Sequence, residues 1–214
     1  MKKVSVKTFE ELKPVLAQKN VKLKNNEIIY RVFRSQKKQK NLRYDLTILY
    51  PKMLGNEFPK TFGHYHKNNE PEYYEVLKGE AIFILQKPSK DFLKIKEVYA
   101  VLVREGEKMI VPKFFGMTMI NPTKKELKVG NWIDESVINV YDAYQKAKGA
   151  AYYCLKDKNG GVKFVKNKHY KEVPELKILA PQKLPNQLLK LSFLSQPQKF
   201  LKFLTIKKLF SQIN

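Results

Sequence analysis

Arginine is scarce in this sequence, although the chain is strongly basic. Of its 42 basic residues only four are arginines, and the net charge of +22 comes almost wholly from lysines scattered along 214 residues. Surfaces that read nucleic-acid bases or clamp phosphates favour the planar fork of arginine over lysine. The charge therefore indicates a solvated lysine surface, and we expect no nucleic-acid partner.

Cysteine and long apolar runs are equally scarce. Cys154 is the single cysteine, which excludes an internal disulfide and suits a reducing compartment. No run of about 18 apolar residues occurs, and no apolar stretch follows the basic start, so we expect neither a spanning helix nor a signal peptide. With 43% hydrophobic residues the composition is that of a globular protein, which we expect to be cytoplasmic.

Short runs of β-branched and aromatic residues fill most of the chain from residue 21 to residue 165. Turn signals such as Lys78-Gly79 and Glu105-Gly106 separate them. Ten such runs with few helical patterns between them predict an all-β antiparallel sandwich or barrel. A short N-terminal helix is expected at residues 8–18, where Thr8 can serve as the cap.

The C-terminal part of the chain has a different composition. Residues 180–214 contain six lysines and no acidic residue. From Pro197 onward apolar residues alternate with lysines at a spacing that predicts a cationic amphipathic helix. We therefore expect a domain of residues 1–179 and an extension of residues 180–214. The extension can pack on its own barrel or a second subunit, contact a membrane surface through residues 198–213, or form a poorly ordered tail.

Two of the three histidines, His64 and His66, lie two residues apart. Positions i and i+2 of a β-strand point to the same face, so both imidazoles can reach one metal ion. A carboxylate from the next strand would complete a facial set of two histidines and one carboxylate, which suits Fe(II) and related ions. The pattern predicts a metal site, and a merely structural pair is the alternative.

The string Thr61-x-Gly63-His64-x-His66…Glu72-x-Tyr74 resembles the first motif of the cupin-type glucose-6-phosphate isomerases of archaea and some bacteria. The segment Tyr44–Thr47 and residues around Tyr141 also fit, so the resemblance covers residues 27–175. It implies a cupin barrel, which is a double-stranded β-helix or jelly roll, with the short N-terminal helix and an amphipathic helical tail. It also implies a metal-dependent isomerase that interconverts glucose 6-phosphate and fructose 6-phosphate in glycolysis and gluconeogenesis.

The resemblance implies a metal site with His64, His66 and Glu72 as ligands for Fe(II) or Mn(II), with Zn(II) as a third candidate. Glu70 stays open as an alternative to Glu72. In this interpretation the ion binds the C1 and C2 oxygens of the open-chain sugar, and Glu72 or a neighbouring carboxylate carries the proton. A hydride shift assisted by the metal is equally compatible with these residues.

The resemblance places the substrate among hydroxyl groups and one backbone amide. Tyr74 and Tyr141 orient the sugar, and Thr47, Thr61 and Gly63 hold its phosphate. The implied partners are a phosphorylated sugar and a second copy of the chain in a homodimer.

Two positions depart from the family pattern. Gly106, Pro112 and Asn121 match the second cupin motif, which places the family's fourth ligand, a histidine, at Met117, and Asn139 stands where a further histidine is common. A thioether has little affinity for Fe(II), Mn(II) or Zn(II) among oxygen and nitrogen ligands. Activity is therefore either retained in impaired form or lost, which would leave a degenerate cupin that binds a sugar phosphate. Another cupin enzyme, such as an Fe(II) dioxygenase or a sugar epimerase, is the remaining alternative.

Overall fold

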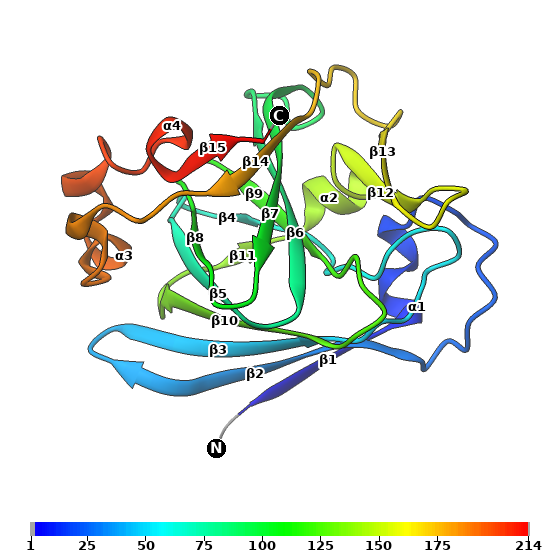
Figure 1. The fold of residues 1–214 in the computed structure, drawn as a ribbon, viewed down its shortest axis with the longest axis horizontal. Helices are drawn as coiled ribbons and strands as arrows, with labels where there is room; N and C mark the ends of the chain where they lie inside the picture. Colours follow the sequence, from blue (N-terminus) through cyan, green and yellow to red (C-terminus); the bar gives the residue numbers. More distant parts are fainter. Residues whose placement is uncertain (1–2, 214) are drawn as a thin grey trace.

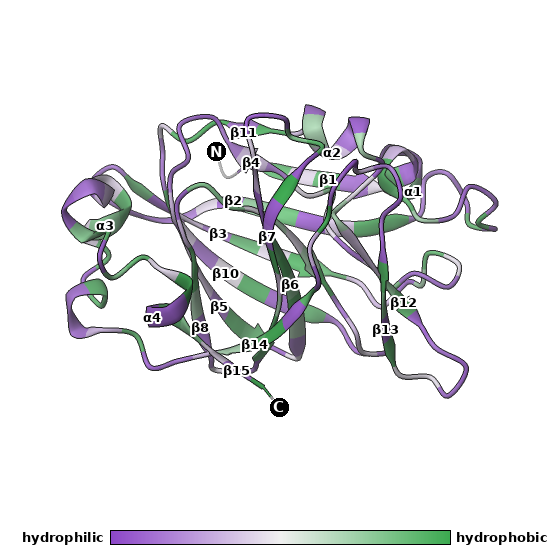
Figure 2. Ribbon diagram, turned by 90° about the horizontal axis from the view of Figure 1, so that it is seen from above, coloured by the Kyte–Doolittle hydropathy of each residue, from purple (hydrophilic) through white to green (hydrophobic). Residues whose placement is uncertain are grey.

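Two facing β-sheets make up most of the protein. The computed structural model describes residues 3–213, and the two sheets lie face to face in it (Figures 1 and 2). Side chains from both sheets form one hydrophobic core. The larger sheet contains, in spatial order, β1 (Val4–Thr8), β2 (Ile28–Gln39), β3 (Leu42–Leu49), β10 (Leu127–Asp134), β5 (Glu72–Lys78) and β8 (Lys108–Val111). The smaller sheet contains β15 (Phe210–Gln212), β14 (Lys177–Pro181), β7 (Ile95–Arg104), β6 (Glu80–Pro88) and β9 (Gly116–Ile120).

Among the described residues, strands that follow one another in the chain lie in opposite sheets of the sandwich at four places, from β5 to β6 and at each step from β7 to β10. β5 and β6 are joined by Gly79 yet belong to different sheets, and so do β8 and β9. Gly79 has a φ of +87°, a conformation that suits glycine because a Cβ atom is strained there. This alternation of the chain between two mainly antiparallel sheets confirms the predicted all-β cupin fold.

Short elements flank the sandwich. The N-terminal helix is confirmed, but it is shorter than predicted: α1 (Phe9–Leu12) carries a capping box from Thr8 and Glu11, and a 3-10 helix, η1 (Lys13–Val15), follows. Pro14, which has no N–H to donate, stands where the α-helix gives way to the 3-10 helix. The remaining elements are β4 (Tyr65–His66), β11 (Asn139–Val140), α2 (Asp142–Lys146), β12 (Tyr152–Lys156) and β13 (Val162–Lys166).

The C-terminal segment packs on the sandwich of its own chain (Figure 1). β14 pairs with β7 in parallel, and β15 pairs with β14 in the antiparallel sense. Between β14 and β15 lie short helices whose apolar residues, such as Phe193 and Leu209, are buried. These helices are η2 (Asn186–Leu188), α3 (Ser192–Ser195), η3 (Pro197–Phe200) and α4 (Ile206–Leu209).

The helical character of the tail is thus confirmed, but a continuous helix from Pro197 onward is wrong. Helix α4 has four residues, and Phe210–Gln212 is a strand. The physical reason is that the outer edge of β14 offers free backbone groups, with which β15 forms hydrogen bonds. No helix among residues 3–213 is long and apolar enough to cross a membrane. The division of the chain at residue 180 stays a prediction.

Candidate active site

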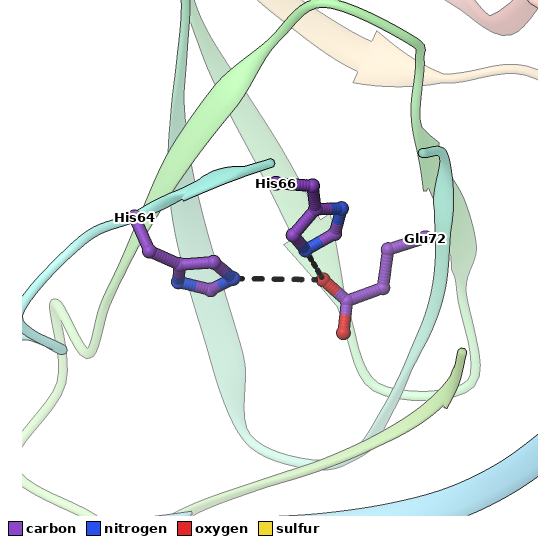
Figure 3. Close-up of side chains that lie close together, drawn as sticks. All are labelled: His64, His66 and Glu72. Carbon is purple, nitrogen blue, oxygen red and sulfur yellow. Dashed lines mark ion pairs between the residues drawn. The ribbon is translucent and has the colours of Figure 1, made fainter. Parts of the chain in front are cut away.

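Three side chains converge inside the sandwich: those of His64, His66 and Glu72. His64 directly precedes β4, and Glu72 is the first residue of β5. The Oε2 atom of Glu72 lies 3.4 Å from Nε2 of His66 and 3.9 Å from Nε2 of His64 (Figure 3). None of these three buried atoms has a hydrogen-bond partner among the described residues. Buried polar atoms without partners are costly, so this set of donors fits a divalent metal ion.

Two hydrogen bonds orient the donors. Nδ1 of His66 donates to the backbone oxygen of Glu70 at 2.8 Å, which leaves the lone pair of Nε2 for a metal. Nδ2 of Asn131 donates to Oε1 of Glu72 at 2.7 Å, which leaves Oε2 facing the histidines. Glu72 is therefore the carboxylate of the cluster, whereas the carboxylate of Glu70 accepts the backbone N–H of Asn68.

The two histidines have opposite pKa shifts. Burial, together with a smaller effect of the neighbouring His66, lowers the pKa of His64 to about 4. Burial also opposes the charged form of His66, but its contact with Glu72 outweighs burial and raises the pKa of His66. Burial would raise the pKa of Glu72, yet the contact with His66 and the charges of both histidines lower it. Without a metal, His64 is therefore neutral, and His66 and Glu72 favour an ion pair.

The cluster of His64, His66 and Glu72 adjoins a pocket between the sheets. His64 and Glu72 form part of its wall, and strands β1, β2, β3, β5, β9 and β10 contribute inward-facing side chains. The structure brings together the residues that the sequence predicts for the substrate: Thr47, Thr61, Gly63, Tyr74 and Tyr141 all line the pocket.

The predicted phosphate positions lie on different parts of the pocket wall: Thr47 is on β3 of the larger sheet, whereas Thr61 and Gly63 lie beside β9 of the smaller sheet. The hydroxyl oxygen of Thr61 accepts the backbone N–H of Met119 at 3.0 Å, so its own proton is free to donate to a ligand. Gly63 has a φ of +86°, and a Cβ atom there would collide with Thr118 and Tyr144. Only glycine therefore lets the chain pass at this point and continue into His64.

The departures from the family pattern lie in the same place. Met117 is 3% exposed and lines the pocket, and the hydroxyl of Tyr74 contacts its sulfur at 3.9 Å. Asn139 also lines the pocket and pairs with His66 between β11 and β4. The remaining histidine, His169, is not part of the cluster.

Sequence reasoning missed several polar residues of the pocket, among them Arg34, Arg43 and Asn131. A signal for Arg43 was present, because it lies two residues before Asp45 and so shares its face of β3. Arginine is also rare in this chain, which makes two of the four arginines in one pocket notable. Asn131 gave no such signal, because its partner Glu72 lies 59 residues away.

The fold and the cluster define a cupin with a candidate site of two histidines and one carboxylate. Comparison with known proteins narrows this class. The model of the family "Glucose-6-phosphate isomerase (GPI)" matches residues 6–173. The chain therefore belongs to the glucose-6-phosphate isomerase family.

Curated relatives agree with this assignment. A glucose-6-phosphate isomerase of Thermococcus litoralis is 30% identical over 130 residues, which cover 58% of this chain and 65% of that protein. The enzyme of Thermococcus kodakarensis is 28% identical over 165 residues, which cover 72% and 78% of the two chains. The glucose-6-phosphate isomerase of Pyrococcus abyssi is 33% identical over 101 residues, which cover 46% of this chain and 50% of that protein. The matched part thus spans about half to two thirds of several of these relatives.

Solved structures show only a distant likeness. A cupin-superfamily sugar phosphate isomerase from Silicibacter pomeroyi is 13% identical with a TM-score of 0.38, covering 68% of this chain and 81% of that one. An oxalate oxidase in complex with glycolate is 18% identical with a TM-score of 0.42, covering 53% and 55% of the two chains. Likenesses this weak add nothing on substrate or reaction.

Proposed function

We propose that the protein is a metal-dependent isomerase that interconverts glucose 6-phosphate and fructose 6-phosphate. The observation that carries the proposal is the cluster of three unpartnered donor atoms, from His64, His66 and Glu72, in a pocket that also holds Thr47 and Thr61. Membership of the glucose-6-phosphate isomerase family supports the isomerase reaction. The donor atoms and hydroxyl groups of the pocket support a mechanism that uses a metal ion. The single cysteine, Cys154, is free and buried, which supports the cytoplasm as the working compartment.

The ligands suit Fe(II) or Mn(II) best, and Zn(II) is also compatible with two imidazoles and a carboxylate. A bound ion would supply positive charge next to the sugar's C1 and C2 oxygens. The lowered pKa of Glu72 keeps its carboxylate ionised near neutral pH, so it can accept a proton from C2 or C1 and return it to the other carbon. Asn131 holds the carboxylate in place through Oε1.

The two tyrosines have separate tasks in this proposal. Burial and the charge of Glu72 raise the pKa of Tyr74 well above its ordinary value, so Tyr74 stays protonated and donates a hydrogen bond to a sugar oxygen. Tyr141 is 37% exposed at the edge of the pocket and packs edge-on against Phe62, where it can flank the sugar chain. Thr47, Thr61 and the backbone N–H of Gly63 hold the phosphate.

A homodimer is part of the proposal. β1 is the outermost strand of the larger sheet, and two apolar side chains on it, Val4 and Val6, are 46% and 38% exposed. A free edge with exposed valines is a surface that a second copy of the chain can cover. Size-exclusion chromatography with light scattering measures this directly, and a monomeric mass would remove the dimer from the proposal.

The test is a coupled assay of fructose 6-phosphate conversion after chelation and after reconstitution with Fe(II), Mn(II) or Zn(II). We expect turnover that depends on the metal and that Glu72→Gln lowers by roughly 100-fold or more. Glu70→Gln is the matched control, because its carboxylate lies outside the cluster, and it should retain most of the activity. Turnover that is absent with every metal, or unchanged in Glu72→Gln, would overturn the proposal.

A second candidate function is favoured by Met117 and Asn139, which occupy two positions where the family has histidines. With the fourth ligand lost at Met117 and the further histidine replaced by Asn139, the pocket would bind a sugar phosphate without converting it. Binding of glucose 6-phosphate to the metal-loaded protein with no turnover would favour this function over the isomerase.

A further inference from the structure

Two guanidinium groups meet on one buried carboxylate at the wall of the pocket. Nη1 of Arg34 and Nε of Arg43 contact the same oxygen of Asp45, Oδ2, at 3.0 Å and 3.1 Å. The backbone N–H of Ser35 donates to the other oxygen, Oδ1, at 2.8 Å. The Asp45 side chain is only 2% exposed, whereas that of Arg34 is 31% exposed. Asp45 is thus a fixed anchor that orients both arginines.

The backbone of β2 is shaped for this contact. The register of β2 and β3 breaks between Phe33 and Lys37, and within the break Ser35 has a φ of +53°. A bulge of this kind re-aims the side chains of a strand. Here it brings both the Ser35 amide and the Arg34 side chain onto Asp45.

The arginines lie at the mouth of the pocket. Arg34 and Arg43 line the inner pocket, and they also line an adjoining surface hollow. Asn139 and Tyr141 also line both the inner pocket and the surface hollow. The side-chain oxygen of Asn139 is buried and has no partner among the described residues, so it can accept a sugar hydroxyl. A phosphorylated sugar entering the pocket would pass all four residues.

The mouth carries surplus positive charge. One carboxylate, Asp45, faces two guanidinium groups, which always stay protonated. The hollow contains one other acid, Glu135, whose carboxylate pairs with Lys38 at 2.6 Å. The backbone oxygen of Glu135 accepts a hydrogen bond from Arg43 Nη1 at 3.3 Å, and Lys3 adds a further cation to the hollow. One arginine is enough to neutralise the carboxylate of Asp45. The positive charge of the second arginine therefore remains available to an anionic ligand.

We infer that Arg34 and Arg43, oriented by Asp45, form an oxyanion site for a phosphate group at the mouth of the pocket. It is distinct from the hydroxyl groups of Thr47 and Thr61, because Thr47 lies one same-face step, about 7 Å, further along β3 than Asp45. A guanidinium fork binds two phosphate oxygens at once and must be held in a fixed orientation to do so. The buried carboxylate of Asp45 provides this fixed orientation. The phosphate at the mouth comes either from a sugar phosphate that binds there on its way to Thr47 and Thr61 or from free phosphate. The first source rests on the proposed function, and the site itself does not.

The test measures binding of inorganic phosphate to the metal-free protein by calorimetric titration. We expect Arg43→Gln and Arg34→Gln to weaken the binding by tenfold or more. Lys38→Gln is the matched control: it leaves the fork intact and only unpairs Glu135 at the hollow, so it should weaken binding much less than the arginine variants do. Thr47→Val should leave binding at the mouth in place. Equal weakening in Lys38→Gln and Arg43→Gln, or loss of all phosphate binding in Thr47→Val, would overturn the inference.

A second variant guards against misfolding. Arg43→Lys keeps a positive charge beside Asp45 but removes the fork. It should fold with an unchanged circular dichroism spectrum and bind phosphate more weakly than the wild type does. Full phosphate affinity in a folded Arg43→Lys protein would remove the fork from the site.

Competition separates the two sources of phosphate. If the phosphate of the sugar occupies the mouth, glucose 6-phosphate displaces inorganic phosphate. Arg43→Lys then weakens the binding of glucose 6-phosphate but not the binding of glucose. If free phosphate occupies it, both ligands bind together. Arginine variants that bind phosphate like the wild type would disprove the site even in an active isomerase. Phosphate binding that depends on the arginines in a protein without turnover would disprove only the proposed function.

Discussion

Met117 lies directly opposite His64 on the neighbouring strand. The backbone N–H of His64 donates to the oxygen of Met117 at 3.1 Å, and the N–H of Met117 donates to the oxygen of His64 at 3.0 Å. Residues paired in this way across an antiparallel bridge present their side chains on the same face. Both side chains line the pocket, so position 117 stands where one more ligand would reach the metal.

Met117→His should therefore restore a fourth ligand. We expect tighter metal binding by about tenfold or more, equivalent to about 1.4 kcal/mol, and higher isomerase turnover. The measurement is a titration of Mn(II) or Fe(II) with each variant, followed by the isomerase assay. Met119→His is the control, because Met119 lines the same pocket but pairs with Thr61. Equal effects of the two histidines would contradict the assignment of position 117.

Asn131 should act on the metal through Glu72. Asn131→Leu removes the donor to Oε1, which frees the carboxylate to rotate and leaves a buried oxygen without a partner. We expect metal affinity to fall roughly tenfold and the free energy of unfolding to fall by about 1–3 kcal/mol. Asn167→Leu serves as the control: Asn167 is 1% exposed and binds two backbone oxygens away from the cluster. It should lower stability and leave metal affinity unchanged.

Metal affinity should rise with pH. The pKa of His66 is raised from its ordinary 6.5 in the metal-free protein because of Glu72, so the folded state holds this proton more tightly than the unfolded state. The stability contributed by the His66–Glu72 pair is complete below the ordinary pKa and is lost as pH rises through the raised value. Metal binding displaces the same proton, so affinity increases over this range and then levels off. His64, with a pKa of about 4, contributes nothing near neutral pH.

Calorimetry in buffers of different ionisation enthalpy measures this proton. We expect more proton release per bound metal at pH 6 than at pH 9. An affinity that stays constant over the same range would rule out displacement of a proton from His66.

A buried ion pair should stabilise the segment that precedes Thr61. The side chains of Lys60 and Glu57 are 4% and 1% exposed and pair with each other. Lys60 also donates to the backbone oxygen of Val15, and Glu57 accepts the backbone N–H of Ala17, so the pair ties the N-terminal helical turn to the core. Lys60→Met leaves the Glu57 charge buried and should cost about 3–5 kcal/mol of unfolding free energy.

Urea unfolding of Lys60→Met, Glu57→Leu and the double variant checks this expectation. The double variant should lose less than the sum of the two single variants, because it leaves no unpaired charge. Lys38→Gln breaks an exposed pair and should cost much less. Additive losses would show that the two side chains do not interact.

The sequence by itself predicted the three residues of the candidate metal cluster and the departure from the family pattern at Met117. The spacing of His64 and His66 follows from the two-residue period of a strand, and the motif spacing led to Glu72 and to Met117. The alternation of short apolar runs and turns likewise indicated a sandwich of β-strands. These features depend on neighbours within a few residues or on one short motif, and such patterns are readable without a structure.

Only the tertiary structure decided which distant strands meet. The bond from Asn131 to Glu72 depends on β10 lying beside β5, and the joining of Arg34 to Asp45 depends on a register break between β2 and β3. The tail is a further case, because Phe210–Gln212 becomes a strand when β14 offers it a free edge, although its own sequence favours a helix. Sheet order and register are set by the packing of the whole chain, and local periodicity does not encode them.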